Sequence, residues 1–264
     1  MADWRSSIVH AEAENLRIRG YEIGELMRQA GFVEVIFLLH RGRLPQPGER
    51  KLLDAMLVGV ADHGAGAPSC AAARLVASGN RQSLSAAVAA GLLAVGDEHG
   101  GAGARCMEMI AAAAARMRSE GLTAAAAAAG AVAEVRQGGR RLPGLGHRVH
   151  LRDPRVAVLF DLAREEGLAG TGVEFMTALE AAAAAAIKPL PLNIDGALGA
   201  LLYDLGFAPA AGMFLFLIGR VAGLTAEVAE EYAREKPMRI RFAVEYDGEP
   251  PRSLDKGGRG ASGG

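Results

Sequence analysis

The chain has 264 residues, half of them hydrophobic, and a formal net charge of −1 at pH 7. This length allows one large domain or two modest ones, and the near-zero charge argues against nucleic acid or an anionic membrane as a partner. Cys70 and Cys106 are far apart, so a disulfide framework is not expected. No signal-peptide pattern opens the sequence, and the apolar run at 213–224 contains Arg220 and is shorter than a bilayer span. A soluble cytoplasmic protein is predicted.

Alanine runs at 111–115, 124–129 and 181–186 favour helices that pack closely, although codon bias could explain part of the excess. Glycines, prolines and polar clusters divide the chain into predicted helices, at residues 23–28, 32–40, 48–61, 68–77, 84–95, 105–119, 123–137, 154–166, 172–187, 195–205 and 209–235. Alternating strand patterns are almost absent, and FAVEYDG (242–248) is the best candidate. The sequence therefore predicts an all-α protein, with a disordered Gly/Pro-rich tail at 248–264.

Two histidines precede glycines and a predicted helix start. They are His63, in VADHGAGAPS, and His99, in VGDEHGGAGARCMEM. Backbone amides at a helix N-terminus favour negative charge, so a neutral His99 there could donate a hydrogen bond to a developing enolate oxygen. As an isolated residue, however, His99 is more simply explained as a polar helix cap, and His63 alone is uninformative.

A cationic, glycine-rich segment, RQGGRRLPGLGHRVHLRDPRV, separates two predicted helices. Gly144 and Gly146 free the backbone before His147, and such a loop can bring amide groups close to an anionic ligand. His147 would then stand at the edge of a cleft. A solvated connecting loop is an equal alternative, in which Arg155 of RDPRV would be an exposed residue at a helix start.

Two charged residues lie in strongly apolar stretches: Asp195 in KPLPLNIDGALGALLYDLG and Arg220 in MFLFLIGRVAGL. Burial raises the pKa of a carboxyl group, as a general base near neutral pH requires. Asp195 could instead be the N-cap of the helix that follows. Arg220 must meet an anion or extend to solvent, and a protein carboxylate or a substrate carboxylate would serve.

Five segments, taken together and in their order along the chain, resemble the citrate synthase superfamily. GLGHRVHLRDPR resembles the signature around its second catalytic histidine, EHGGA the first-histidine segment, LNIDGALGALL the segment of the catalytic aspartate, and VADHG a further citrate-contacting histidine. IRGYEIGELMRQAGFVEVIFLLHRGRLPQPGE is similar to an early substrate-domain stretch. The resemblance covers residues 4–242 and is closest to citryl-CoA lyases and the C-terminal module of ATP-citrate lyase. His150 departs from the usual Tyr or Leu, and the chain is shorter than ordinary citrate synthases.

The resemblance implies an acid–base site. Asp195 would act as the base at the acetyl methyl group, neutral His99 would donate to the thioester oxygen, and His147 would exchange a proton with the oxaloacetate oxygen. Substrate carboxylates would be bound by the family-matched cations Arg155 and Arg220, with His63 as a further donor. Either Arg239 or Arg241 of KPMRIRF would reach the substrate or coenzyme A.

The backbone of Leu145 and Gly146 would seat the coenzyme A adenine. No metal site and no permanently bound cofactor are expected, since the coenzyme A thioester is itself substrate or product.

The implied architecture is a large helical domain (residues 1–100 and 205–245) and a small one (101–204) that close over a cleft. The implied activity is cleavage of (S)-citryl-CoA to acetyl-CoA and oxaloacetate. Citrate synthase and 2-methylcitrate synthase are alternatives, and a non-catalytic acyl-CoA-binding or assembly subunit is a third. A homodimer or higher homo-oligomer is expected, and a citryl-CoA synthetase is a candidate partner.

Overall fold

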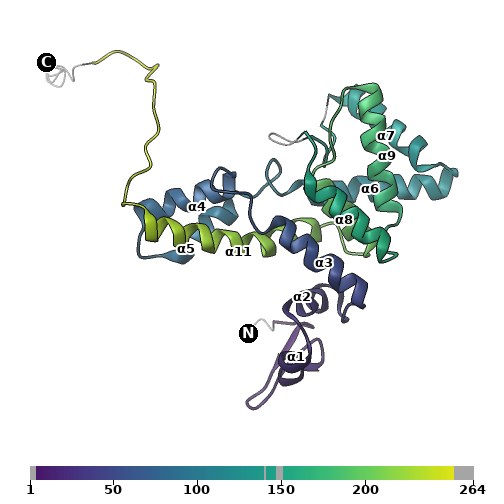
Figure 1. The fold of residues 1–264 in the computed structure, drawn as a ribbon, viewed down its shortest axis with the longest axis horizontal. Coiled ribbons are helices and arrows are strands. Elements are labelled where there is room, and N and C mark those ends of the chain that lie inside the picture. The colour runs from purple at the N-terminus through teal and green to yellow at the C-terminus, as the bar shows by residue number, and fades with distance from the viewer. Residues whose placement is uncertain (1–3, 140, 147–150, 253–264) are drawn as a thin grey trace, which may run out of the picture.

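A computed structural model of the chain describes residues 4–139, 141–146 and 151–252. In this part, a small antiparallel sheet precedes eleven helices (Figure 1). The strands are β1 (Val9–Ala11), β2 (Leu16–Ile18) and β3 (Tyr21–Glu22). The helices are α1 (Ile23–Gln29), α2 (Phe32–Arg41), α3 (Pro47–Val60), α4 (Pro68–Gly79), α5 (Leu84–Leu93), α6 (Ala102–Glu120), α7 (Ala124–Gly138), α8 (Pro154–Glu165), α9 (Thr171–Ala186), α10 (Ile194–Asp204) and α11 (Ala211–Arg234). The predicted all-α class is confirmed.

Capping residues set the helix boundaries. The side-chain oxygens of Ser83, Thr123 and Asn193 each accept a hydrogen bond from an amide in the first turn of α5, α7 and α10. Prolines occupy the first turn of α3, α4 and α8, and left-handed glycines end α2, α6 and α7. Because these signals are local, the predicted helices match the observed ones within about three residues.

Helix α11 connects two hydrophobic cores. The larger core joins α2, α3 and α6–α10 to the first half of α11, and the smaller one joins α4 and α5 to its second half. Figure 1 shows the corresponding arrangement, with α4 and α5 beside one part of α11 and α6–α9 grouped at the other end. The division into a large and a small domain at residues 101–204 stays a prediction.

Glycines let the helix backbones touch. A Cβ atom on Gly212 of α11 would lie 2.5 Å from the carbonyl carbon of Gly103 in α6. A Cβ on Gly199 of α10 would lie 2.5 Å from the Cβ of Cys106 in α6. Close-packed interiors do not absorb such overlaps without backbone shifts. The small residues therefore fix how closely α6, α10 and α11 approach.

The strand predictions differ from the structure. The N-terminal sheet pairs Val9 with Ile18 and Ile18 with Tyr21, but its strands have only two or three residues, which is too short for an alternating pattern. The prediction of a strand at FAVEYDG is wrong, because residues 242–248 are extended, exposed and without a partner strand in the described chain. Figure 1 shows this segment leaving the helical body.

Among the described residues, α11 is the one helix long and apolar enough to cross a membrane, with a mean hydropathy of 1.5 over its most apolar window. The expectation from residues 213–224 underestimated the length of the helix, which runs to Arg234. Other helices bury 56% of that window. Core helices pass the same length and composition test.

We expect Gly212→Ala to lower the thermal midpoint, since the added methyl group collides with the α6 backbone at a cost of about 1–3 kcal/mol. Gly130→Ala in α7 is the matched control, because its Cβ would meet only the tip of Arg116, at 3.7 Å. That substitution should be neutral or stabilising by up to about 1 kcal/mol. Equal midpoints for the two variants in thermal denaturation would contradict the proposed backbone contact.

Candidate active site

Asp195 lies in the first turn of α10 with its carboxyl group buried. Its Oδ1 atom is shielded from solvent and accepts no hydrogen bond from the described residues. Burial raises the pKa of this carboxyl to about 6, against the opposing charges of Arg155 and Arg220. The N-cap of α10 is Asn193, so the capping alternative for Asp195 is wrong. A carboxyl in this state can both hold and accept a proton near neutral pH.

His99 is held by Ser69 at the start of α4. The Ser69 backbone amide donates to His99 Nε2 at 3.3 Å, and Ser69 Oγ lies 2.9 Å from the same nitrogen. Because Arg220 Nη1 donates to Ser69 Oγ at 3.1 Å, the hydroxyl proton is directed to His99. Nε2 is therefore an acceptor, and the proton of a neutral His99 is on Nδ1. The N-cap of α6 is Gly101, so His99 is not a helix cap.

Ser69 was not predicted from the sequence. A serine after a proline at a helix start is a common pattern, and its bonds reach residues 30 and 151 positions away. The Ser69 hydroxyl connects His99 and Arg220, which the sequence indicated only as separate candidates.

Arg220 lies in the middle of α11 and is almost completely buried, at 2% exposure. Its Nε donates to the Val60 carbonyl at 2.9 Å, and its guanidinium stacks 4.8 Å from the centre of the Phe216 ring. Within the part of the chain that the structure describes, no carboxylate forms an ion pair with it. The alternative of a protein counter-ion is thus not found there. A buried guanidinium of this kind is suited to a ligand carboxylate.

Arg155, by contrast, is paired with a neighbouring aspartate. Its Nε and Nη2 atoms donate to the two carboxylate oxygens of Asp153 at 2.8 and 2.7 Å, and Nη1 donates to the Gly59 carbonyl at 3.0 Å. Its charge nevertheless acts on Asp195. The predicted role of Arg155 toward a substrate carboxylate would require it to share or exchange these bonds.

The glycine loop before residue 147 is fixed to the start of α10. Gly146 donates to the Pro191 carbonyl at 2.7 Å and accepts from Asn193 Nδ2 at 2.7 Å, while Leu145 forms a bridge with Leu192. Gly144 has φ +79°, and a Cβ there would lie 2.6 Å from the Gly196 Cα, so glycine is required. His147 and His150 lie outside the described residues.

The remaining predicted residues lie in two other segments, the turn after α3 and the chain after α11. Arg239 donates to Glu231 through Nε at 2.9 Å, whereas Arg241 is exposed on the extended segment. His63 is exposed, and its backbone amide donates to Asp62 Oδ1 at 2.7 Å. The roles of these three residues stay predictions.

One group of possible metal ligands, not expected from the sequence, comprises Asp62, Cys70 and Glu227. The Cys70 thiol donates to Asp62 at 3.1 Å, and Glu227 pairs with Arg74. Burial and the Asp62 carboxylate raise the pKa of this thiol to about 11. Hydrogen bonding and ion pairing account for the group, because a metal ligand would have to be a thiolate.

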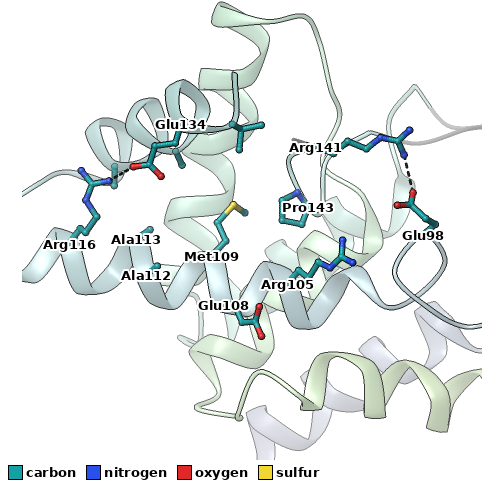
Figure 2. A pocket seen from close by; sticks show the side chains of 13 residues that line it. Glu98, Arg105, Glu108, Met109, Ala112, Ala113, Arg116, Glu134, Arg141 and Pro143 are labelled. Carbon is teal, nitrogen blue, oxygen red and sulfur yellow. Dashed lines mark hydrogen bonds and ion pairs between the residues drawn. The ribbon is translucent and has the colours of Figure 1, made fainter. Parts of the chain in front are cut away.

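A cleft of about 650 Å³ lies between α6 and α7. Figure 2 shows ion pairs at two of its edges, Arg116–Glu134 and Arg141–Glu98, each at 2.9 Å. The floor is apolar, with Met109, Ala112 and Ala113 of α6. Glu98 directly precedes His99 in sequence, but the lining contains neither His99, Asp195 nor Arg220. The cleft therefore adjoins the His99 turn without containing the candidate acid–base groups.

We expect Asp195→Asn to change how the stability of the protein depends on pH. The pKa of Asp195 rises from 3.8 to about 6 on folding, so the folded state binds more protons in this window and its stability falls as pH rises through it. Asparagine cannot ionise. The variant should therefore gain about 2 kcal/mol relative to the original chain between pH 4 and pH 7. Urea titrations at several pH values measure the free energy of unfolding. A difference between the two proteins that does not change with pH would contradict the burial of Asp195.

Comparisons with known proteins match nearly the whole chain to one family. The family model described as citrate synthase, C-terminal domain, matches residues 1–51 and 45–241. A solved structure described as citryl-CoA lyase from Hydrogenobacter thermophilus is 38% identical, with a TM-score of 0.85, and the match covers 95% of this chain and 97% of that one.

Two curated relatives are longer proteins. A probable ATP-citrate synthase of Caenorhabditis elegans is 30% identical over 87% of this chain, and a citrate synthase of Mycolicibacterium smegmatis is 29% identical over 86%. The chain spans only 22% and 58% of their respective lengths.

Proposed function

The chain belongs to the citrate synthase family, and we propose that within it the protein is an enzyme that cleaves (S)-citryl-CoA to acetyl-CoA and oxaloacetate. The observation that carries this proposal is the buried Asp195 carboxyl, which lies in the field of a buried Arg220 that is bonded through Ser69 to His99. The 38% identity to a citryl-CoA lyase, over nearly the full length of both chains, supports cleavage rather than condensation as the direction of the reaction.

The proposed cleavage begins at the tertiary hydroxyl of citryl-CoA, from which His147 removes the proton. The bond between the acetyl and oxaloacetyl carbons then breaks, the hydroxyl oxygen becomes the oxaloacetate carbonyl, and the electron pair of the bond forms the enolate of acetyl-CoA. His99 donates from Nδ1 to the thioester oxygen, where negative charge develops. Asp195, protonated near its pKa of about 6, returns a proton to the methyl carbon. Each proton transfer of this type contributes about 10²–10⁴-fold.

Substrate carboxylates need cations, and Arg220 is the best-placed candidate. Its guanidinium is buried, oriented by Val60 and Ser69, and acts electrostatically on Asp195. Arg155 and His63 remain proposed additional donors. In the C-terminal segment we favour Arg241 over Arg239, because Arg239 is bonded to the buried Glu231. The Leu145–Gly146 backbone is proposed to contact the coenzyme A adenine.

Citrate synthase is the second candidate, and the M. smegmatis relative favours it. Condensation uses the same three groups in reverse and adds hydrolysis of the thioester. A 2-methylcitrate synthase of Corynebacterium glutamicum is 36% identical over 42% of this chain, and one methylene in the acyl pocket changes selectivity by about 1–3 kcal/mol. A purely acyl-CoA-binding subunit would not need the Ser69–His99 arrangement.

Assembly is proposed from the family resemblance, and location from the cysteine content of the sequence. We expect a homodimer or higher homo-oligomer in the cytoplasm, with a citryl-CoA synthetase as a candidate partner. Closure of the two predicted domains would exclude water while the enol exists.

Incubation with citryl-CoA should yield acetyl-CoA and oxaloacetate, identified by mass spectrometry. Asp195→Ala should lower kcat by about 10²–10⁴-fold while changing KM much less, because the carboxyl acts in the proton transfer. A second incubation with acetyl-CoA and oxaloacetate distinguishes the candidates, since free coenzyme A and citrate indicate the synthase. A variant that keeps near-full kcat would remove Asp195 from the mechanism.

Ser69→Ala should lower kcat about tenfold or more, because removing the hydroxyl leaves the tautomer of His99 less fixed. Ser78→Ala in the same helix is the matched control, since Ser78 is buried and its hydroxyl has no hydrogen-bond partner within the described chain. Nitrogen-15 chemical shifts of His99 report the tautomer directly. If Ser69→Ala leaves both the tautomer and kcat unchanged, the serine has only a packing role.

A further inference from the structure

Asp153 connects the starts of two helices. As the N-cap of α8 it accepts from the Arg155 backbone amide at 3.1 Å, and its carboxylate also takes two bonds from the Arg155 side chain. Its Oδ2 accepts from the amide of Ile194, the first residue of α10, at 3.1 Å. The side chain of Asp153 is completely buried. It therefore contacts the backbone next to Asp195 and the cation whose charge acts on Asp195.

Three amides at the start of α10 are engaged by other residues. The Asp153 carboxylate accepts a hydrogen bond from the Ile194 amide. The Asn193 side chain accepts from the Gly196 amide, and the Asn193 carbonyl accepts from the Ala197 amide. A helix N-terminus normally stabilises a carboxylate through its unpaired amides. Here those amides serve Asp153 and Asn193, and the Asp195 Oδ1 atom has no donor within the described residues.

Three described charged groups act on the Asp195 carboxyl, and one thiol lies within reach of its charge. The charged groups are Asp153 and Arg155 at the start of α8 and Arg220 on α11, and the thiol is that of Cys106 on α6. The arginines favour the ionised carboxyl, whereas burial and the Asp153 charge disfavour it. On α9, which also packs against α10, Glu180 accepts from the Leu192 amide at 2.7 Å. Asp153 is thus the group that offsets Arg155, the arginine with the larger effect on Asp195.

We propose that Asp153 is a positioning residue for the acid–base chemistry: it holds Arg155 away from the Asp195 carboxyl and occupies the amide that would otherwise stabilise the ionised form. The functional meaning of this inference depends on the proposed role of Asp195. Its physical content, the dependence of the Asp195 protonation state on Asp153, does not.

A simple capping role for Asp153 predicts something different. A cap that only stabilises α8 would lower stability when removed and would leave the titration of Asp195 unchanged. Asp204 provides the matched control, because it is a half-buried aspartate that accepts from the Gly170, Gly172 and Val173 amides at the start of α9.

The experiment is Asp153→Asn, with the Asp195 carboxyl followed by carbon-13 NMR in protein labelled at the aspartate carboxyl carbons. Asp195→Asn identifies the resonance. Asparagine retains an acceptor for Ile194 but loses the charge that neutralises Arg155, so the Asp195 midpoint should fall by about 1 pH unit or more. Asp204→Asn should lower stability without moving the midpoint. An unchanged midpoint in folded Asp153→Asn would overturn the inference.

A second variant separates charge from folding. In Asp153→Asn/Arg155→Gln the uncompensated cation is also removed, and the midpoint should return toward that of the original chain. Failure to return would overturn the electrostatic explanation. If Asp153→Asn does not fold, Arg155→Gln alone provides the test, because loss of the cation should raise the midpoint, and an unchanged midpoint would overturn the inference.

Kinetics provide an independent reading. With citryl-CoA, Asp153→Asn should lose kcat roughly tenfold with a smaller change in KM, since Arg155 is still present to bind a carboxylate. A loss of activity that appears only as a higher KM, with kcat unchanged, would count against a positioning role for Asp153. If the original chain has no turnover but the NMR midpoints shift as expected, the proposed function fails while the inference about Asp153 stands.

Discussion

The withdrawal of one carboxyl group from water is the constraint on which the candidate site depends. Asp195 is an acid placed where a helix N-terminus and two arginines would ordinarily keep it ionised. The surrounding structure opposes this tendency by burial and by giving the available amides to Asn193 and Asp153. The site therefore maintains a proton-accepting group in the field of two arginines, whose guanidinium groups are suited to the carboxylates of a ligand.

Close helix packing makes that burial possible. Gly144 and Gly196 touch through their backbones, and Gly199 meets α6 beside Cys106. Larger side chains at these positions would separate α10 from the glycine loop and from α6. Space opened there would admit water to the carboxyl and reduce the desolvation on which its raised pKa depends. The abundant alanine and glycine thus contribute to the chemistry as well as to helix formation.

The sequence predicted most helices because the signals that start and stop them are local. Ser83, Thr123 and the prolines at 47, 68 and 154 act within one turn of their own positions. Asp195 and Arg220 were also identifiable, since a charge in an apolar segment is conspicuous. Ser69 and Asp153 were not, because their importance comes from bonds to residues 30 to 151 positions away. The short β-strands were missed because pairing, rather than composition, creates them.

The length of α11 has a mechanical consequence. Its 24 residues form a rod of about 36 Å, with one half in each hydrophobic core and Arg220 near its middle. Phe216, one turn earlier, lies against both the His99 ring and the Arg220 guanidinium. A change in how α4 and α5 pack would tilt this helix. Because Phe216 contacts both side chains, Arg220 and His99 would then move together.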